Sequence, residues 1–161
     1  GFEKIAINTI AAKKPDIVSE LSEQVGSQSV IVSIDEKKNW FGSYSVYIED
    51  GTKKYKMDAV EYAQLIEEKG AGEILLTSIN QEGTWSGYDI NITKKISDAV
   101  HIPVIAQGGA SSVQDIADVV KKGGASAAAI GSMVVYQQEG MGVLVNFPDK
   151  EELNKKLHRY G

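Results

Sequence analysis

Two carboxylates stand just beyond apolar segments of the chain and could do acid–base chemistry. Asp35 follows an apolar, β-branched run, and Glu82 lies in a glycine-rich loop a few residues after the run Ile74–Leu76. Adjacent parallel strands lie ~4.8 Å apart, so carboxylates at their ends can face one substrate. In different environments such a pair can divide acid and base roles. The alternative is one surface acid and one helix-capping acid.

A second group of residues could bind an anion. Gly108, Gly109 and Ala110 precede a predicted helix, and Gly131 and Ser132 follow the last predicted strand. Glycine lets backbone N–H groups approach a phosphate closely, and the dipole of the helix adds a favourable potential. The two segments together predict a phosphate site. The alternative is a pair of ordinary strand-to-helix turns.

Asn8 and Thr9 follow the first predicted strand and could hold a second phosphate through side-chain and backbone donors. Asn and Thr are also common strand-end residues, so this pattern is weak by itself. No cluster of side chains has metal-ligand spacing, and we expect neither a metal nor another cofactor. Of the two tryptophans, Trp85 lies in the loop of Glu82, and we expect Trp40 to pack against a β-hairpin.

The elements that would position these residues alternate between strands and helices. We expect strands at residues 4–8, 29–34, 74–76, 103–106 and 126–130, and a β-hairpin at 40–55 inserted after the second strand. Amphipathic spacing predicts helices between them, with Asp89 and Ser111 or Ser112 as caps, and a last helix starting near Pro148 or Asp149. Short apolar strands separated by such helices indicate a parallel sheet with right-handed crossovers.

Two architectures fit this order, an open doubly wound sheet or part of a (β/α)8 barrel. The barrel is favoured because the polar and glycine-rich segments all follow strands, and because the last two strand ends look like the paired phosphate loops of a barrel. No G-x-G-x-x-G segment follows the first strand. A whole barrel takes about 250 residues, so 161 residues would supply roughly its last five strands. We expect residues 1–161 to form a single domain.

Composition narrows the class of partner. The net charge of −5 argues against a nucleic-acid backbone or an anionic membrane surface as the main partner. The absence of cysteine excludes disulfides and thiolate nucleophiles and fits a reducing cytoplasm. No apolar run approaches a membrane span or a signal peptide. The chain begins at Gly1 almost directly with a strand, which suggests that this is not the natural start.

Several segments in order resemble HisF, the cyclase subunit of imidazole glycerol phosphate synthase. They are residues 4–9, 31–35, 70–78, 83–84, 86–89, 103–106 and 108–110. The resemblance implies strands four to eight of a barrel. It also implies a lyase of histidine biosynthesis that uses ammonia from a HisH-type glutaminase. The products would be imidazole glycerol phosphate and an aminoimidazole carboxamide ribotide, made from a phosphorylated nucleotide substrate.

The resemblance also assigns roles to particular residues. Asp35 would be a catalytic carboxylate, and Glu82 stands where the family normally has a third carboxylate, an Asp. The phosphate sites would comprise Asn8 and Thr9 on one side and Gly83, Gly108, Gly109, Gly131 and Ser132 on the other. Lys4 and Glu73 would form part of an ammonia gate at the opposite face of the barrel.

Three departures from the HisF pattern keep other functions open. They are Glu82, Gln107 in place of Ser, and the tail at 142–148 with its apolar run 143–147, which looks more like HisF-type proteins of surface-glycan pathways, the WbuZ-like group. Those proteins are thought to channel ammonia for amidation. A non-catalytic partial-barrel scaffold and a HisA-like isomerase are further alternatives. We expect the chain by itself to be inactive, with an exposed edge at its first strand.

Overall fold

The computed structural model describes residues 3–136, 142–143 and 145–158. Its strands are β1 (Ile5–Ile7), β2 (Val30–Lys38), β3 (Tyr44–Ile48), β4 (Lys53–Asp58), β5 (Glu73–Ser78), β6 (Val104–Gln107) and β7 (Ala127–Ala128). Its α-helices are α1 (Thr9–Lys13), α2 (Asp16–Val25), α3 (Ala59–Glu68), α4 (Ile90–Ala99), α5 (Val113–Lys121), α6 (Ser132–Val135) and α7 (Lys150–His158). All five predicted strands are present, whereas the short helix α1 was not predicted.

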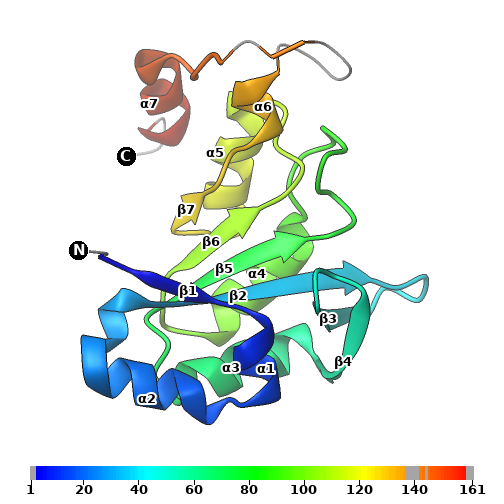
Figure 1. Cartoon of the computed structure of the whole chain (residues 1–161). Coiled ribbons are helices and arrows are strands. Elements are labelled where there is room, and N and C mark those ends of the chain that lie inside the picture. Colours follow the sequence, from blue (N-terminus) through cyan, green and yellow to red (C-terminus); the bar gives the residue numbers. More distant parts are fainter. Residues whose placement is uncertain (1–2, 137–141, 144, 159–161) are drawn as a thin grey trace.

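The parallel strands follow one another across the sheet in chain order. β1 pairs with β2, β2 with β5, β5 with β6, and β6 with β7, all in parallel. A doubly wound sheet would reverse its order at a switch point, and none occurs among the described strands. α3 contacts α4, and α4 contacts α5, so these crossover helices form a continuous layer (Figure 1). This sequential order is that of part of a (β/α)8 barrel.

The two faces of the parallel sheet differ in burial. The residues facing the helices are buried, among them Val32, Ile34, Ile74, Leu76 and Ala106. Their neighbours point to the other face and are only half-buried, including the cross-strand row Ser33, Leu75 and Ile105. In a closed barrel this second face fills the interior. In this chain the face is open, and β1, which pairs with β2 alone, lies at the edge of the sheet.

The inserted hairpin is confirmed and is larger than predicted. β2 does not stop at Ile34 but continues to Lys38, because its last four residues pair antiparallel with β3. β3 then pairs antiparallel with β4, which ends at Asp58. Asp58 caps α3 by accepting a hydrogen bond from the N–H group of Val60. The insertion is therefore an antiparallel extension of the same sheet (Figure 1).

The prediction that Trp40 packs against the hairpin is wrong. Its side chain is 98% exposed, and that of Phe41 is 92% exposed. The Asn39 side chain accepts hydrogen bonds from the N–H groups of Phe41 and Ser43, and this closes a tight turn between β2 and β3. Both aromatic residues lie in that turn and are exposed there.

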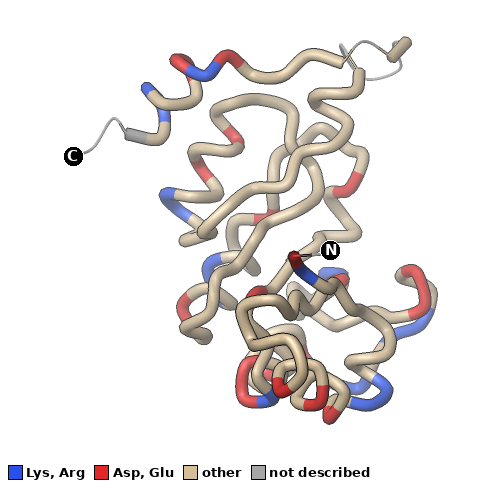
Figure 2. The backbone as a smooth tube through the Cα atoms, turned by 60° about the vertical axis from the view of Figure 1, so that its left-hand side comes forward, with Lys and Arg blue, Asp and Glu red and all other residues tan. Residues whose placement is uncertain are grey.

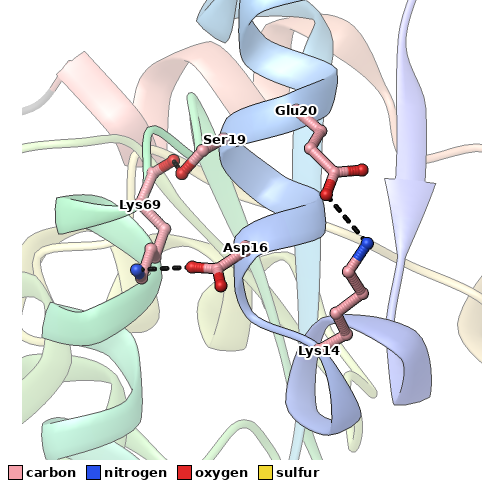
Figure 3. Close-up of polar contacts among 5 residues, drawn as sticks. All are labelled: Lys14, Asp16, Ser19, Glu20 and Lys69. Atoms are coloured by element: carbon pink, nitrogen blue, oxygen red, sulfur yellow. Dashed lines mark hydrogen bonds and ion pairs between the residues drawn. The ribbon is translucent and has the colours of Figure 1, made fainter.

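Polar contacts join the first part of α2 to Lys69, the residue that follows α3. Asp16 and Ser19 of α2 both reach Lys69, which follows α3: the Lys69 ammonium lies 2.7 Å from the Asp16 carboxylate, and the Ser19 hydroxyl donates to the Lys69 carbonyl at 2.9 Å (Figure 3). Lys14 pairs with Glu20 at 2.8 Å on the other side of α2. The hydrogen bond and charge of Lys69 lower the pKa of Asp16. These contacts set where the chain leaves α3 for β5.

The tail lies at one end of the molecule. α7 begins close to the predicted position, and the Asp149 carboxylate accepts hydrogen bonds from the N–H groups of Glu151 and Glu152. α7 packs on α5, with Leu153 against the core. In the apolar run 143–147, Leu144 lies outside the described residues, whereas Val143, Val145 and Phe147 are exposed. This apolar segment has no cover in the described part of the chain.

Charged residues of both signs interleave along the helices and the hairpin (Figure 2). The net charge of −5 is therefore not gathered in one acidic face. Among the described residues, no helix combines the length and apolar character needed to cross a bilayer.

Gly72 offers a direct test of the packing at the start of β5. A Cβ atom there would lie 2.0 Å from the Ser27 carbonyl oxygen, a backbone atom that cannot move aside cheaply. We expect Gly72→Ala to lower the free energy of unfolding by about 3 kcal/mol, the upper part of the range for overpacking. Urea denaturation measures this change. Gly142→Ala is the control, since its Cβ would meet nothing within 4 Å; equal effects of the two changes would contradict the packing described.

Candidate functional site

A row of polar residues crosses the open face of the sheet at the carboxyl ends of its strands. Asp35 pairs in register with Thr77, and Thr77 pairs with Gln107. All three are half-buried and alternate along their strands with buried residues, so their side chains share the open face. The row places the predicted carboxylate Asp35 where a barrel holds its catalytic groups.

Asn8 extends this row to β1. Its side-chain amide donates a hydrogen bond to the Asp35 carboxylate at 2.8 Å. The neighbouring Thr9 hydroxyl accepts a hydrogen bond from the N–H group of Glu49, in the hairpin turn between β3 and β4. The two residues predicted to hold a phosphate thus lie at the expected edge, and here their side chains orient Asp35 and anchor the hairpin.

A pocket of about 220 Å³ opens beside the row. It is formed by the loops that follow β5, β6 and β7, and Gln107 of the polar row contributes to its wall. Six residues predicted to be catalytic or to bind phosphate line it together: Glu82, Gly83, Gly108, Gly109, Gly131 and Ser132. The structure therefore brings these residues together from three separate loops.

Two glycines allow the loops to meet. Gly108 and Gly109 have φ angles of 101° and 93°, in the region that glycine adopts most readily. A Cβ at Gly109 would lie 2.2 Å from the Gly87 carbonyl oxygen. In the structure the N–H group of Gly87 donates to the Gly109 carbonyl at 2.8 Å. The loop after β5 and the loop after β6 are thus in direct backbone contact.

The start of α5 supplies fewer free donors to an anion than the sequence suggests. Ser112 caps the helix, as one of the two predicted alternatives, and Asp115 completes a capping box. The Asp115 carboxylate accepts hydrogen bonds from the N–H groups of Ser111 and Ser112 at 3.0 and 2.9 Å. An anion in the pocket would therefore be bound by N–H groups further upstream, at Gly109 and Ala110, and by the facing loop.

Tyr88 is a positioning residue that the sequence did not reveal. Its ring is buried, and its hydroxyl donates to the Ala129 carbonyl at 2.9 Å, directly after β7. Burial raises the pKa of the Tyr88 hydroxyl, so it remains a donor. The bond ties the loop after β5 to the loop after β7. The signal in the sequence was a single aromatic residue beside Asp89, which does not indicate a partner forty residues away.

Glu82 and Asp35 occupy different parts of this edge. Glu82 is exposed and lines the pocket, with one carboxylate oxygen 3.3 Å from the point where a Gly108 Cβ would stand. Asp35 lies in the polar row, which reaches the pocket wall through Gln107. Both carboxylates are thus on the same edge of the sheet. A division of acid and base roles between them stays a prediction.

Lys4 and Glu73 form an ion pair at the opposite end of the strands. Lys4 precedes β1 and Glu73 is the first residue of β5, so both lie at the amino ends of the parallel strands. The Glu73 side chain is mostly buried, whereas Lys4 is partly exposed. This is the arrangement expected of two residues at the far mouth of a barrel, and their role as a gate stays a prediction.

Glu36 is a buried acid next to the site that the sequence reasoning missed. It follows Asp35 and points to the helix side of the sheet, where it is fully buried and neither carboxylate oxygen has a hydrogen-bond partner in the described structure. Burial raises its pKa to about 7; the Ser78 hydroxyl opposes this shift and the charge of Asp89 adds to it. Ser78 lies near the carboxyl without a hydrogen bond of normal geometry. Strict alternation along β2 could have shown that residue 36 faces the core.

The fold and the site define a partial (β/α)8 barrel with a glycine-rich pocket at the carboxyl ends of its strands. Residues 1–140 match the family model described as "Histidine biosynthesis protein", and the chain belongs to this family.

Two of the relatives similar to this chain are named as HisF subunits. The imidazole glycerol phosphate synthase subunit HisF of Alkaliphilus metalliredigens is 47% identical over 138 residues, which are 86% of this chain and 55% of the relative. HisF of Prochlorococcus marinus is 43% identical over 83% of the chain and 53% of the relative. The chain thus spans about half the length of these curated relatives.

A Pseudomonas aeruginosa protein, named provisionally as subunit hisF2 of the same synthase, is 40% identical over 154 residues. The match covers 96% of the chain and 61% of the relative. This match is longer than the matches to the two HisF proteins above.

The buried acid Glu36 makes a prediction about stability and pH. Its pKa is about 7 in the folded chain against an ordinary value of 4.5, so the folded state binds the proton more tightly than the unfolded state. Stability is therefore greatest below the ordinary pKa and falls as pH rises through about 7, by at most about 3 kcal/mol. We expect Glu36→Gln to remove this fall, and urea denaturation between pH 4.5 and 8 measures it. An unchanged pH profile in the variant would contradict the assignment.

Proposed function

We propose that this chain is the C-terminal part of a HisF-type cyclase, a lyase of histidine biosynthesis in the cytoplasm. The reaction joins ammonia to a phosphorylated carboxamide nucleotide and yields imidazole glycerol phosphate and aminoimidazole carboxamide ribotide. The observation that carries the proposal is the pocket beside Asp35, because it unites glycine-rich loops from three strand ends in a chain of the histidine biosynthesis family.

The geometry supports phosphate binding at one part of the sheet edge and proton transfer at another. A substrate phosphate would accept hydrogen bonds from the N–H groups around Gly109 and Ser132, which line the pocket. The rest of the substrate would lie along the polar row toward Asp35, whose carboxylate is oriented by the 2.8 Å bond from Asn8. Asp35 would move protons during ring closure, as a positioned carboxylate can.

Ammonia would come from a HisH-type glutaminase. The curated relatives are named as subunits, which implies a complex with a second chain. The partner would dock at the end of the strands that carries Lys4 and Glu73, opposite the pocket. Ammonia would then cross the barrel interior along the open face of this sheet before reaching Asp35. No nucleic acid or membrane takes part in this scheme.

Glu82 and Gln107 set this chain apart from the usual pattern. Glu82 carries one more methylene than Asp, and a displacement of about 1 Å at a reacting group can cost about 10²-fold in rate. Gln107 stands between the polar row and the pocket, where its amide could contact the middle of the substrate. We infer that both residues adjust the fit of the substrate between its phosphate and Asp35.

The pocket favours this enzyme over a non-catalytic scaffold, because it gathers Glu82 and three glycine-containing loops on the edge of the sheet that carries Asp35. Neither the surface-glycan alternative nor the isomerase alternative gains support from the relatives named above, which are called subunits of the synthase. We therefore propose the cyclase function and none of these three alternatives.

Turnover in vitro tests the proposal. The chain is mixed with the N-terminal segment of the Alkaliphilus metalliredigens relative that it does not cover, and formation of imidazole glycerol phosphate is followed with ammonium salts as nitrogen source. We expect turnover in the mixture, none with the chain alone, and a loss of at least about 10²-fold for Asp35→Asn.

Asp50→Asn, the same chemical change in the hairpin turn, is the matched control and should keep full activity. The proposal would be contradicted by turnover that survives Asp35→Asn, or by comparable activity of the chain alone.

A further inference from the structure

The loop between β5 and α4, residues 79–88, carries three of the residues that line the pocket: Glu82, Gly83 and Trp85. Its ends are Ser78, the last residue of β5, and Asp89, the cap of α4. Within the loop, Trp85 has a φ angle of 59°, which is unfavourable for a residue with a side chain. The loop therefore needs support from its surroundings to keep this conformation.

Glu36 lies beneath this loop. Its carbonyl oxygen accepts a hydrogen bond from the N–H group of Ile79 at 2.9 Å, and Asn80 accepts one from the N–H group of Lys38 at 2.8 Å. The start of the loop is thus attached to β2 on either side of Glu36. The Glu36 side chain has no exposed surface, and three buried oxygen atoms here lack a hydrogen-bond partner: its two carboxylate oxygens and the Ser78 hydroxyl. A buried carboxylate without donors is costly, whereas its neutral form can donate.

The groups around Glu36 come from four elements. The charge of Asp89 favours the neutral form of Glu36, whereas the Ser78 hydroxyl and the charge of Lys38 favour the ionised form. Asp89 of the α4 cap is negative and accepts hydrogen bonds from two N–H groups of α4. Tyr44 of β3 donates its hydroxyl to Asp89 at 3.1 Å. Ser78 of β5 is uncharged. Lys38 of β2 and Lys95 of α4 are the nearby cations, and both ammonium groups lie over the Tyr44 ring, 5.5 and 5.4 Å from its centroid.

We propose that Glu36, as a neutral acid, is a positioning residue that braces the pocket loop 79–88 between its two ends, and that its ionisation loosens the loop. In the neutral state the carboxyl is a donor as well as an acceptor, and it lies beside the Ser78 hydroxyl, the third unpartnered oxygen here. After loss of the proton, a fully buried negative charge stands at the base of the loop near that of Asp89, with no hydrogen-bond donor to stabilise it. Burial raises the pKa of Glu36, the Ser78 hydroxyl opposes this shift, and the charge of Asp89 adds to it.

The brace concerns the conformation of the loop and does not depend on the proposed reaction. It makes the arrangement of Glu82, Gly83 and Trp85 a function of pH around neutrality. It also gives a reason for an acid at the buried residue 36, since an apolar side chain could not change its charge with pH.

Quenching of Trp85 fluorescence by acrylamide tests the brace in the full chain. The chain has two tryptophans, so Trp40→Phe at the exposed hairpin tip leaves Trp85 as the single reporter. We expect the quenching constant to rise through one transition centred near pH 7. In this background Glu36→Gln should abolish the transition and hold the low value throughout, whereas Glu82→Gln should keep it. A transition that persists in Glu36→Gln, or none in the parent, overturns the proposal.

A second variant keeps the test decisive if Glu36→Gln does not fold. Asparagine caps helices as well as aspartate does, so Asp89→Asn should preserve α4 while removing the charge that faces Glu36. The midpoint of the quenching transition should then move to lower pH. An unmoved midpoint, or one that moves to higher pH, contradicts the brace.

Discussion

The parallel register of β2, β5 and β6 determines where every candidate site residue lies. Because side chains alternate along a strand, the pairing of Asp35 with Thr77 and of Thr77 with Gln107 places all three on one face at one height. A slip of one residue would exchange this row with the buried residues Ile34, Leu76 and Ala106. Hydrophobic burial on the helix side therefore holds the polar row in place on the other side.

The same sheet separates the pocket from the Lys4–Glu73 ion pair by the length of its strands. The loops with the pocket meet at the carboxyl ends of the strands, held by the Gly87–Gly109 backbone contact and by Tyr88, while Lys4 and Glu73 pair at the amino ends. The half-buried face between them would line the interior of a complete barrel. A costly feature near the site is Glu36, a buried acid without hydrogen-bond partners in the described structure, which lies under the loop of Glu82. Its position links the protonation of a buried group to the shape of the pocket.

Sequence patterns predicted the secondary-structure elements and the polar residues at strand ends, but they did not predict the contacts between distant segments. Hydrophobic periodicity and the residues typical of turns and helix ends predicted the five parallel strands, the hairpin and the helix caps at Asp89 and at Ser111 or Ser112. These features depend on residues that are neighbours in the chain. The exposure of Trp40, the continuation of β2 to Lys38 and the bond from Tyr88 to Ala129 depend on which distant segment lies alongside, and no local pattern encodes that. Glu36 was not predicted because its raised pKa results from burial, which no local pattern of residues shows. The meeting of Gly108, Gly131 and Glu82 in one pocket was predicted only because barrel strands end at a shared edge.

The most direct measurement is a crystal structure of the chain soaked in inorganic phosphate, since the account places Asp35 and the anion pocket on one edge of one sheet. We predict a single phosphate in the pocket of the last three strand-end loops, accepting hydrogen bonds from the N–H groups of Gly109 and Ser132, with the Asp35–Asn8 contact on the same edge. The account would be contradicted by a phosphate bound on another face with the pocket empty, or by strands whose order places Asp35 and Gly109 at opposite ends.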